Sequence, residues 1–155
     1  MSIKYFKGCV VDAFETGQYF FLLHQANCFN TMNSGVAKAI RERLPEAYAS
    51  DCKTVKGDRN KLGTFSEAGI DSLSAFVINL YGQYNYGRDG KKYTQVDKLE
   101  QALTKFTEWV VVNERLICMP RMGCGLGGAD WDTELVPMIE RQLISRGFEV
   151  HVYDK

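Results

Sequence analysis

The sequence predicts an α/β protein in which a sheet is layered between helices. Short apolar or alternating runs interleave with segments whose apolar residues recur at helical spacing, which is the pattern of that class. Near the end of the chain, four glycines fall within residues 123–128, between one apolar run and one helical segment. We find no internal repeat, low-complexity segment or linker, so we expect residues 1–155 to form one domain.

Six runs are predicted to be strands: residues 3–8, 20–23, 64–68, 74–80, 115–119 and 148–152. The second run is continuously apolar, so we expect this strand to be central and covered on both faces. Asp71, between the third and fourth runs, indicates a tight turn.

Apolar spacing predicts four helices. The first begins near Gly35 and ends at Pro45, where a second short helix runs to about Cys52. A long helix covers residues 96–110, and Thr94 with Asp97 resembles a capping box at its start. The last helix carries Leu135, Ile139 and Leu143, and Gly147 follows it as a C′ glycine.

Composition excludes several classes of protein. The formal net charge is +0, so no global field attracts nucleic acid or a membrane, and no apolar run reaches transmembrane length. The five cysteines form no Cys-x-x-Cys pair, and only two histidines accompany them, so we expect neither a metal site nor a cofactor. The odd cysteine count and the lack of a signal-peptide pattern favour reduced thiols and a cytoplasmic location.

Three loops leave the predicted strands at their carboxyl ends, where ligands bind in such folds. They are residues 24–35, an aromatic loop (residues 81–92) and a glycine loop (residues 123–130). Glycines before a helix N-terminus present N–H groups to an anion, so the glycine loop is predicted to bind phosphate. The alternative is that this loop only connects two elements and binds no ligand. Its G-x-G-x-x-G pattern lies too near the C-terminus for a dinucleotide-binding domain.

Two other phosphate-handling designs fail. There is no G-x-x-x-x-G-K-[ST] motif, so the chain has no P-loop. A cysteine phosphatase requires an arginine six residues after its nucleophile, but the residue six positions after Cys124 is Asp130. Cys124 is therefore interpreted as a small buried filler beside the glycines.

The chain resembles the macrodomain family, an ADP-ribose-binding α/β fold. The resemblance covers nearly the whole length and rests on four motifs: Lys7-Gly8, His24-Gln25-Ala26-Asn27, Ser34-Gly35-Val36-Ala37 and residues 119–126, Met-Pro-Arg-Met-Gly-Cys-Gly-Leu. The last motif is similar to the branch that contains terminal ADP-ribose glycohydrolases and ADP-ribose 1″-phosphate phosphatases. The resemblance implies a three-layer α/β/α fold with a mixed, mostly parallel central sheet.

The resemblance also implies a binding site. Asn27 would contact a ribose, Tyr153 would flank the adenine or its ribose, and Tyr81 would occupy the place of a lysine that the glycohydrolase branch uses. The first phosphate loop would comprise Ser34, Gly35 and Val36, and the adenine edge would comprise Gly8, Cys9 and Val10. The second phosphate loop would comprise Gly123, Cys124, Gly125, Leu126 and Gly127.

His24 and Asp130 each have two readings. His24 either caps the second strand through a backbone hydrogen bond or transfers a proton, since the phosphatase branch has a histidine at this place. Asp130 is either the N-cap of the last helix or a residue that positions water and acts with His24 as its acid–base partner. Tyr84 and Tyr86 of the aromatic loop would stack on the ligand, contact a partner or simply pack.

The sequence departs from the family at three positions. Tyr81 replaces the glycohydrolase lysine, Gly127 replaces the aspartate of the glycine loop, and Cys9 replaces the aspartate that binds adenine. We therefore expect a monomeric enzyme whose partner is a small-molecule ligand, with no membrane or general nucleic-acid partner. It would hydrolyse ADP-ribose 1″-phosphate by means of His24, Asn27 and Asp130. The alternatives are a hydrolase that removes ADP-ribose from protein or nucleic acid, and a binding module without turnover.

Overall fold

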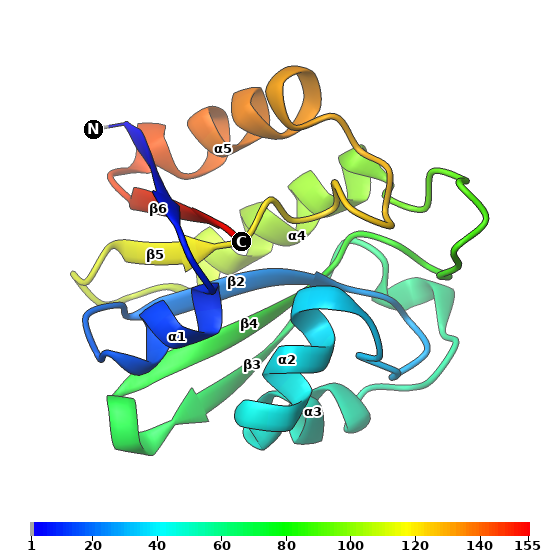
Figure 1. The fold of residues 1–155 in the computed structure, drawn as a ribbon, viewed down its shortest axis with the longest axis horizontal. Helices are drawn as coiled ribbons and strands as arrows, with labels where there is room; N and C mark the ends of the chain where they lie inside the picture. Colours follow the sequence, from blue (N-terminus) through cyan, green and yellow to red (C-terminus); the bar gives the residue numbers. More distant parts are fainter. Residues whose placement is uncertain (1) are drawn as a thin grey trace.

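A computed structural model describes residues 2–155, which fold around one six-stranded sheet (Figure 1). The strand order across the sheet is β1-β6-β5-β2-β4-β3. The strands are β1 (Ile3–Lys7), β2 (Phe21–Ala26), β3 (Phe65–Ile70), β4 (Ala75–Tyr81), β5 (Leu116–Met119) and β6 (Glu149–Asp154). Every neighbouring pair is parallel except β3 with β4, so the expectation of a mixed, mostly parallel sheet is confirmed.

Helices cover both faces of the sheet, as the predicted three-layer fold requires (Figure 1). On one face lie α4 (Val96–Trp109) and α5 (Val136–Gln142). On the other lie α1 (Val10–Glu15), α2 (Gly35–Arg43) and α3 (Pro45–Cys52). A separate buried apolar cluster fills the space between the sheet and each helical layer.

Strand β2 lies inside the sheet, between β5 and β4, and nearly all of it is buried. Phe21 and Leu23 belong to the cluster under α4 and α5, whereas Leu22 belongs to the cluster on the opposite face. Alternate side chains of a strand point to opposite faces, so a strand covered on both sides must be apolar at consecutive positions. The predicted central strand is confirmed.

Two local predictions are wrong. No helix was expected at α1, because its six residues are too few to show helical spacing, although Val10, Val11 and Phe14 are all buried. The capping box at α4 is absent: Gln95 is the N-cap and makes no side-chain cap. Thr94 instead donates its hydroxyl to the carbonyl of Gly123 in the glycine loop.

The last helical segment is more irregular than predicted. A π-helical turn (Trp131–Leu135) precedes α5, and a 3₁₀ turn (Ile144–Arg146) follows it. Gly147 has a φ of 90° and ends the segment, as predicted for a C′ glycine. No helix within residues 2–155 is both long and apolar enough to span a bilayer.

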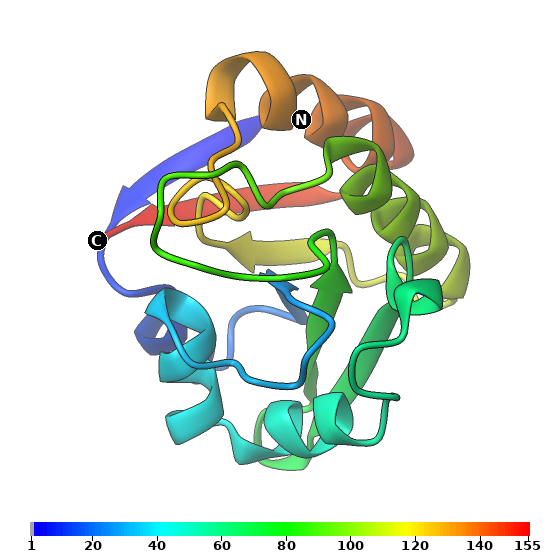
Figure 2. The ribbon, with the colours of Figure 1, turned by 90° about the vertical axis from the view of Figure 1, so that its right-hand side faces the viewer.

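The three long loops gather on one side of the molecule. Residues 27–34 follow β2, the aromatic loop follows β4, and the glycine loop follows β5. Figure 2 looks onto this side and shows the aromatic loop passing across it, between the other two loops. Parallel strands bring their carboxyl ends to one edge, so these segments meet although they are far apart in sequence.

Candidate functional site

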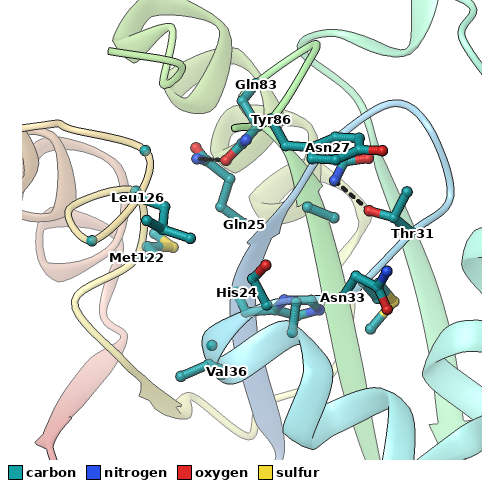
Figure 3. A pocket seen from close by; sticks show the side chains of 18 of the residues that line it. His24, Gln25, Asn27, Thr31, Asn33, Val36, Gln83, Tyr86, Met122 and Leu126 are labelled. Atoms are coloured by element: carbon teal, nitrogen blue, oxygen red, sulfur yellow. Dashed lines mark hydrogen bonds between the residues drawn. The ribbon is translucent and has the colours of Figure 1, made fainter. Parts of the chain in front are cut away.

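A cavity of about 800 Å³ opens between the three loops. That volume lies within the usual range for small-molecule sites. Figure 3 shows the side chains around it. Its lining comprises residues 24–27, 31–37, 83, 86–88, 120–123 and 125–127. The predicted site residues among them are His24, Asn27, Ser34, Gly35, Val36, Gly123, Gly125, Leu126 and Gly127.

His24 lies at the carboxyl end of β2 and is 1% exposed. Its Nε2 is 2.6 Å from Oδ1 of Asn79, and its Nδ1 has no hydrogen-bond partner among residues 2–155. Burial lowers the pKa of His24 to about 4, although the hydrogen bond to Asn79 and the nearby backbone of Gln25 raise it in part. His24 is therefore a neutral imidazole near pH 7 and can accept a proton.

Asn27 shapes the loop between β2 and α2. Its amide donates to the Thr31 hydroxyl at 2.7 Å, and its Oδ1 accepts from the Phe29 N–H at 2.8 Å. The second bond closes an Asx turn. The Asn27–Thr31 bond is drawn in Figure 3, at the rim of the cavity opposite Leu126. The side chain therefore fixes the backbone of a loop that lines the cavity.

The start of α2 forms one wall of the cavity. Ser34 is its N-cap but makes no side-chain hydrogen bond to the first turn, and Gly35 has a φ of 55°. The first N–H groups of a helix have no partner within the helix, and the helix dipole adds positive charge there. Because Ser34 does not cap them, these groups are available to an anionic ligand.

The glycine loop is held in place by the segment just after the aromatic loop. The carbonyl of Gly127 accepts hydrogen bonds from the N–H groups of Tyr93 and Thr94, at 2.9 and 3.0 Å. A Cβ atom at Gly127 would lie 2.3 Å from Thr94 Oγ1 and 2.6 Å from the Gly123 carbonyl oxygen. A Cβ at Gly125 would meet nothing within 4 Å. Close packing therefore requires glycine at 127 but not at 125.

The charges in the lining are positive. Arg121 forms a bidentate ion pair with Asp154, whose pKa it lowers. Arg88 comes from the aromatic loop, reaches across the cavity to Ser34 Oγ at 3.5 Å, and has no carboxylate partner within the described chain. No aspartate or glutamate of residues 2–155 lines the cavity. The site therefore suits an anion.

Three predicted residues lie near the cavity without lining it. Tyr81 is fully buried and donates its hydroxyl to Asp51, away from the cavity. Asp130 is exposed, and its carboxylate caps the following turn by accepting from the Thr133 N–H at 2.9 Å. Cys124 is half-buried, with its Sγ 3.5 Å from the Met122 carbonyl, and burial raises the pKa of its thiol to about 11.

The predicted adenine edge lies at the ends of β1 and β6, outside the cavity lining. Gly8 donates its N–H to the Asp154 carbonyl at 2.7 Å, Cys9 is the N-cap of α1, and Val10 is buried. The Tyr153 hydroxyl lies 2.6 Å from that of Tyr19. The structure thus brings most of the residues predicted to bind ribose and phosphate together in one cavity, whereas Cys124 and the predicted adenine-binding residues lie outside its lining.

Sequence reasoning missed several residues of the lining. Gln25 donates to Gln83 Oε1 at 2.6 Å and to Thr94 Oγ1 at 2.9 Å, which ties β2 to the aromatic loop and to the segment just after it. The position of Arg88 depends on the course of that loop, and no motif marks it. No group of three or more metal-binding side chains occurs among residues 2–155.

Comparison with known proteins identifies the fold. The sequence model of the Macro domain family matches residues 23–136. A 17.5 kDa protein of the tk-vs intergenic region of Enterobacteria phage T4 is 35% identical over 135 residues, covering 85% of this chain and 84% of the phage protein.

Solved structures of other proteins have the same fold as this chain. A protein of unknown function from Bacteroides thetaiotaomicron superposes with a TM-score of 0.82 at 25% identity, covering 100% of this chain and 99% of that one. Thermosipho africanus DarTG in complex with ADP-ribose superposes with a TM-score of 0.74 at 17% identity, covering 99% of this chain and 41% of that one. At this identity the second match concerns the fold alone.

Proposed function

The chain belongs to the Macro domain family, and from that premise we propose that it binds ADP-ribose and hydrolyses ADP-ribose 1″-phosphate to ADP-ribose and inorganic phosphate. The ligand would lie across the cavity at the carboxyl ends of β2, β4 and β5. Thermosipho africanus DarTG, of which 41% superposes on this chain, forms a complex with ADP-ribose, and this supports the choice of ligand.

The cavity suits a ligand with several phosphates. The uncapped start of α2 and the glycine loop face each other, and both offer backbone N–H groups to the diphosphate. Arg88 adds a cation that no carboxylate of the described residues neutralises. A phosphate on the 1″ oxygen adds further negative charge, which such a site favours over a neutral hydroxyl.

The observation that carries the phosphatase proposal is the state of His24: a buried, neutral imidazole whose Nδ1 lacks a partner, in a cavity lined by no carboxylate of the described chain. His24 Nδ1 would take a proton from the attacking water as its oxygen bonds to phosphorus. The bond from phosphorus to the 1″ oxygen breaks on the opposite side of phosphorus, so the leaving 1″ oxygen takes its proton from solvent water, and His24 afterwards releases its own proton to water. The loops would stabilise the charge on the transferred phosphoryl group, and Asn27 would hold the ribose.

Steric and chemical features weigh against the glycohydrolase route. An aspartate at Gly127 would place its Cβ within 2.6 Å of two oxygen atoms, so the loop as built excludes that residue. At the place of the lysine stands Tyr81, and burial beside Asp51 raises the pKa of its hydroxyl far above the neutral range. Neither position therefore supplies the charge that the glycohydrolase branch uses.

The test is phosphate release from ADP-ribose 1″-phosphate, with calorimetric binding of ADP-ribose to the same samples. We expect turnover by the wild type. In His24→Ala the rate should fall at least about 100-fold, the usual contribution of a general base, while the dissociation constant for ADP-ribose stays within about threefold. Melting temperatures of both samples show whether the variant is folded.

Three other outcomes would be informative. Binding without turnover in the wild type removes the phosphatase and leaves a binding module, or a hydrolase that acts on ADP-ribosylated protein or nucleic acid. Turnover that persists in a folded His24→Ala variant removes His24 from the chemistry. If the wild type shows neither binding nor turnover, that result contradicts the proposed ligand.

A further inference from the structure

His24 is the first member of a row of polar residues across the sheet. The register of the parallel β2–β4 pair places His24 beside Asn79, and the antiparallel β3–β4 pair places Asn79 beside Ser66. All three are buried, in strands that are otherwise largely apolar. Buried polar groups cost free energy unless they are hydrogen-bonded, so the bonds along this row are constrained.

The orientation of the Asn79 amide follows from its contact with α3. Asn79 Nδ2 lies 3.1 Å from the carbonyl oxygen of Ala47, and a carbonyl can only accept. The nitrogen of the amide therefore faces Ala47, and its oxygen faces His24 at 2.6 Å. Because Oδ1 is an acceptor only, His24 Nε2 must carry the proton between them.

The other end of the row requires the same direction. The Tyr81 hydroxyl donates to Asp51 Oδ1 at 2.6 Å, and Ser66 Oγ lies 2.8 Å from that hydroxyl. With its own proton used on Asp51, Tyr81 must accept from Ser66, and Ser66 Oγ can then accept from Asn79 Nδ2 at 3.0 Å. The carbonyl of Ala47 and the carboxyl group of Asp51 are independent acceptors, and both give the same orientation of the Asn79 amide.

We propose that Asn79 is a positioning residue that fixes His24 as its Nε2–H tautomer, so that the buried Nδ1, which has no hydrogen-bond partner among residues 2–155, keeps a lone pair that can accept a proton. The assignment of the tautomer stands on the hydrogen bonds alone, whereas its effect on rate rests on the phosphatase function proposed above. Asn79 lines no part of the cavity and acts only through His24.

The first arm of the test measures the tautomer in the wild type. Long-range ¹H–¹⁵N spectra distinguish a protonated ring nitrogen from a bare one, and the chain has only two histidines, so the variant His151→Gln assigns both. We expect His24 to show one species at pH 7, with the proton on Nε2. A proton on Nδ1, or on both nitrogens, would overturn the proposal whether or not the protein is a phosphatase.

The second arm compares Asn79→Leu with Val77→Ala. Val77 lies two residues earlier in β4, is equally buried and packs in the same face of the sheet, so its truncation destabilises the fold but removes no partner of the His24–Asn79 hydrogen bond. We expect Asn79→Leu to lose the single-tautomer spectrum and to lower kcat about 10- to 100-fold, the range seen when the hydrogen-bonded partner of a metal-binding histidine is removed. KM should stay within about threefold, and Val77→Ala should keep both the spectrum and kcat.

Either of two results would contradict the positioning role: an unchanged spectrum and kcat in Asn79→Leu, or an equal loss of kcat in Val77→Ala. If Asn79→Leu does not fold, the wild-type spectrum still decides the tautomer. If the wild type proves inactive, the spectrum again stands by itself, so failure of the proposed function and failure of this inference are separable.

Discussion

The hydroxyl of Thr94 donates to the carbonyl of Gly123 at 2.8 Å, and this bond joins the start of α4 to the glycine loop. The same hydroxyl accepts from the Gln25 amide at 2.9 Å. One side chain thus links β2, the segment just before α4 and the glycine loop that follows β5. The glycine loop is consequently packed against Thr94 and has little freedom to rearrange.

This packing predicts unequal effects at two glycines. Gly127→Ala would place a methyl group 2.3 Å from Thr94 Oγ1, so we expect a loss of about 1–3 kcal/mol in the free energy of unfolding and weaker ligand binding. Gly125→Ala meets no atom within 4 Å and should change the free energy of unfolding by less than about 0.5 kcal/mol. Chemical denaturation measures both, and equal losses in the two variants would contradict the packing argument.

Stability should depend on pH through His24. Its pKa is about 4 in the folded chain, below the ordinary histidine value of 6.5, so between these values the unfolded chain binds a proton that the folded chain does not. Stability therefore falls as the pH falls from about 6.5 to 4, by about 3 kcal/mol for this group. Denaturation of the wild type and of His24→Gln across this range isolates the effect, because the variant lacks it. Parallel curves for the two proteins would show that His24 is not buried as a neutral group.

Arg88 should favour ligands with more phosphate. It is a lining cation without a carboxylate partner among residues 2–155, so Arg88→Ala should raise the dissociation constant for ADP-ribose about three- to tenfold, and raise it more for the 1″-phosphate. Lys91→Ala is the matched control, because it removes one charge from the same loop but lies outside the cavity lining. Calorimetry at two salt concentrations measures the effect, and equal losses in both variants would indicate only a general change in charge.

Asp130 should matter for the last helical segment more than for turnover. Its carboxylate accepts from the Thr133 N–H and lies outside the cavity lining. Asp130→Asn keeps an N-capping side chain and should retain both melting temperature and kcat, whereas Asp130→Ala should lower the melting temperature by about 2–4 °C. A large loss of kcat in Asp130→Asn would instead place the carboxylate in the reaction.

Much of the fold could be predicted because its signals are local. The continuous apolar run of β2, Pro45 at the start of α3, and the apolar stripe of α4 are each local signals in the chain. The glycine loop was predicted for the same reason. Helix α1 was missed because six residues carry no readable period.

The polar row at His24 was missed although the sequence contains a signal for it. Asn79 stands inside the apolar run of β4, where an asparagine must find partners. Its partners His24, Ser66 and Ala47 lie 55, 13 and 32 positions away in the chain. No spacing rule connects residues at such separations.

The sequence by itself determined which segments become strands and helices, apart from α1, and that a glycine loop precedes the last helix. Those properties depend on residues within a few positions of one another. Only the tertiary structure decided that Asn79 faces His24, that Arg88 reaches the start of α2, and that Thr94 binds Gly123 and not its own helix. These contacts depend on strand register and loop path, which are set when the whole sheet assembles, because each strand is aligned by its neighbours.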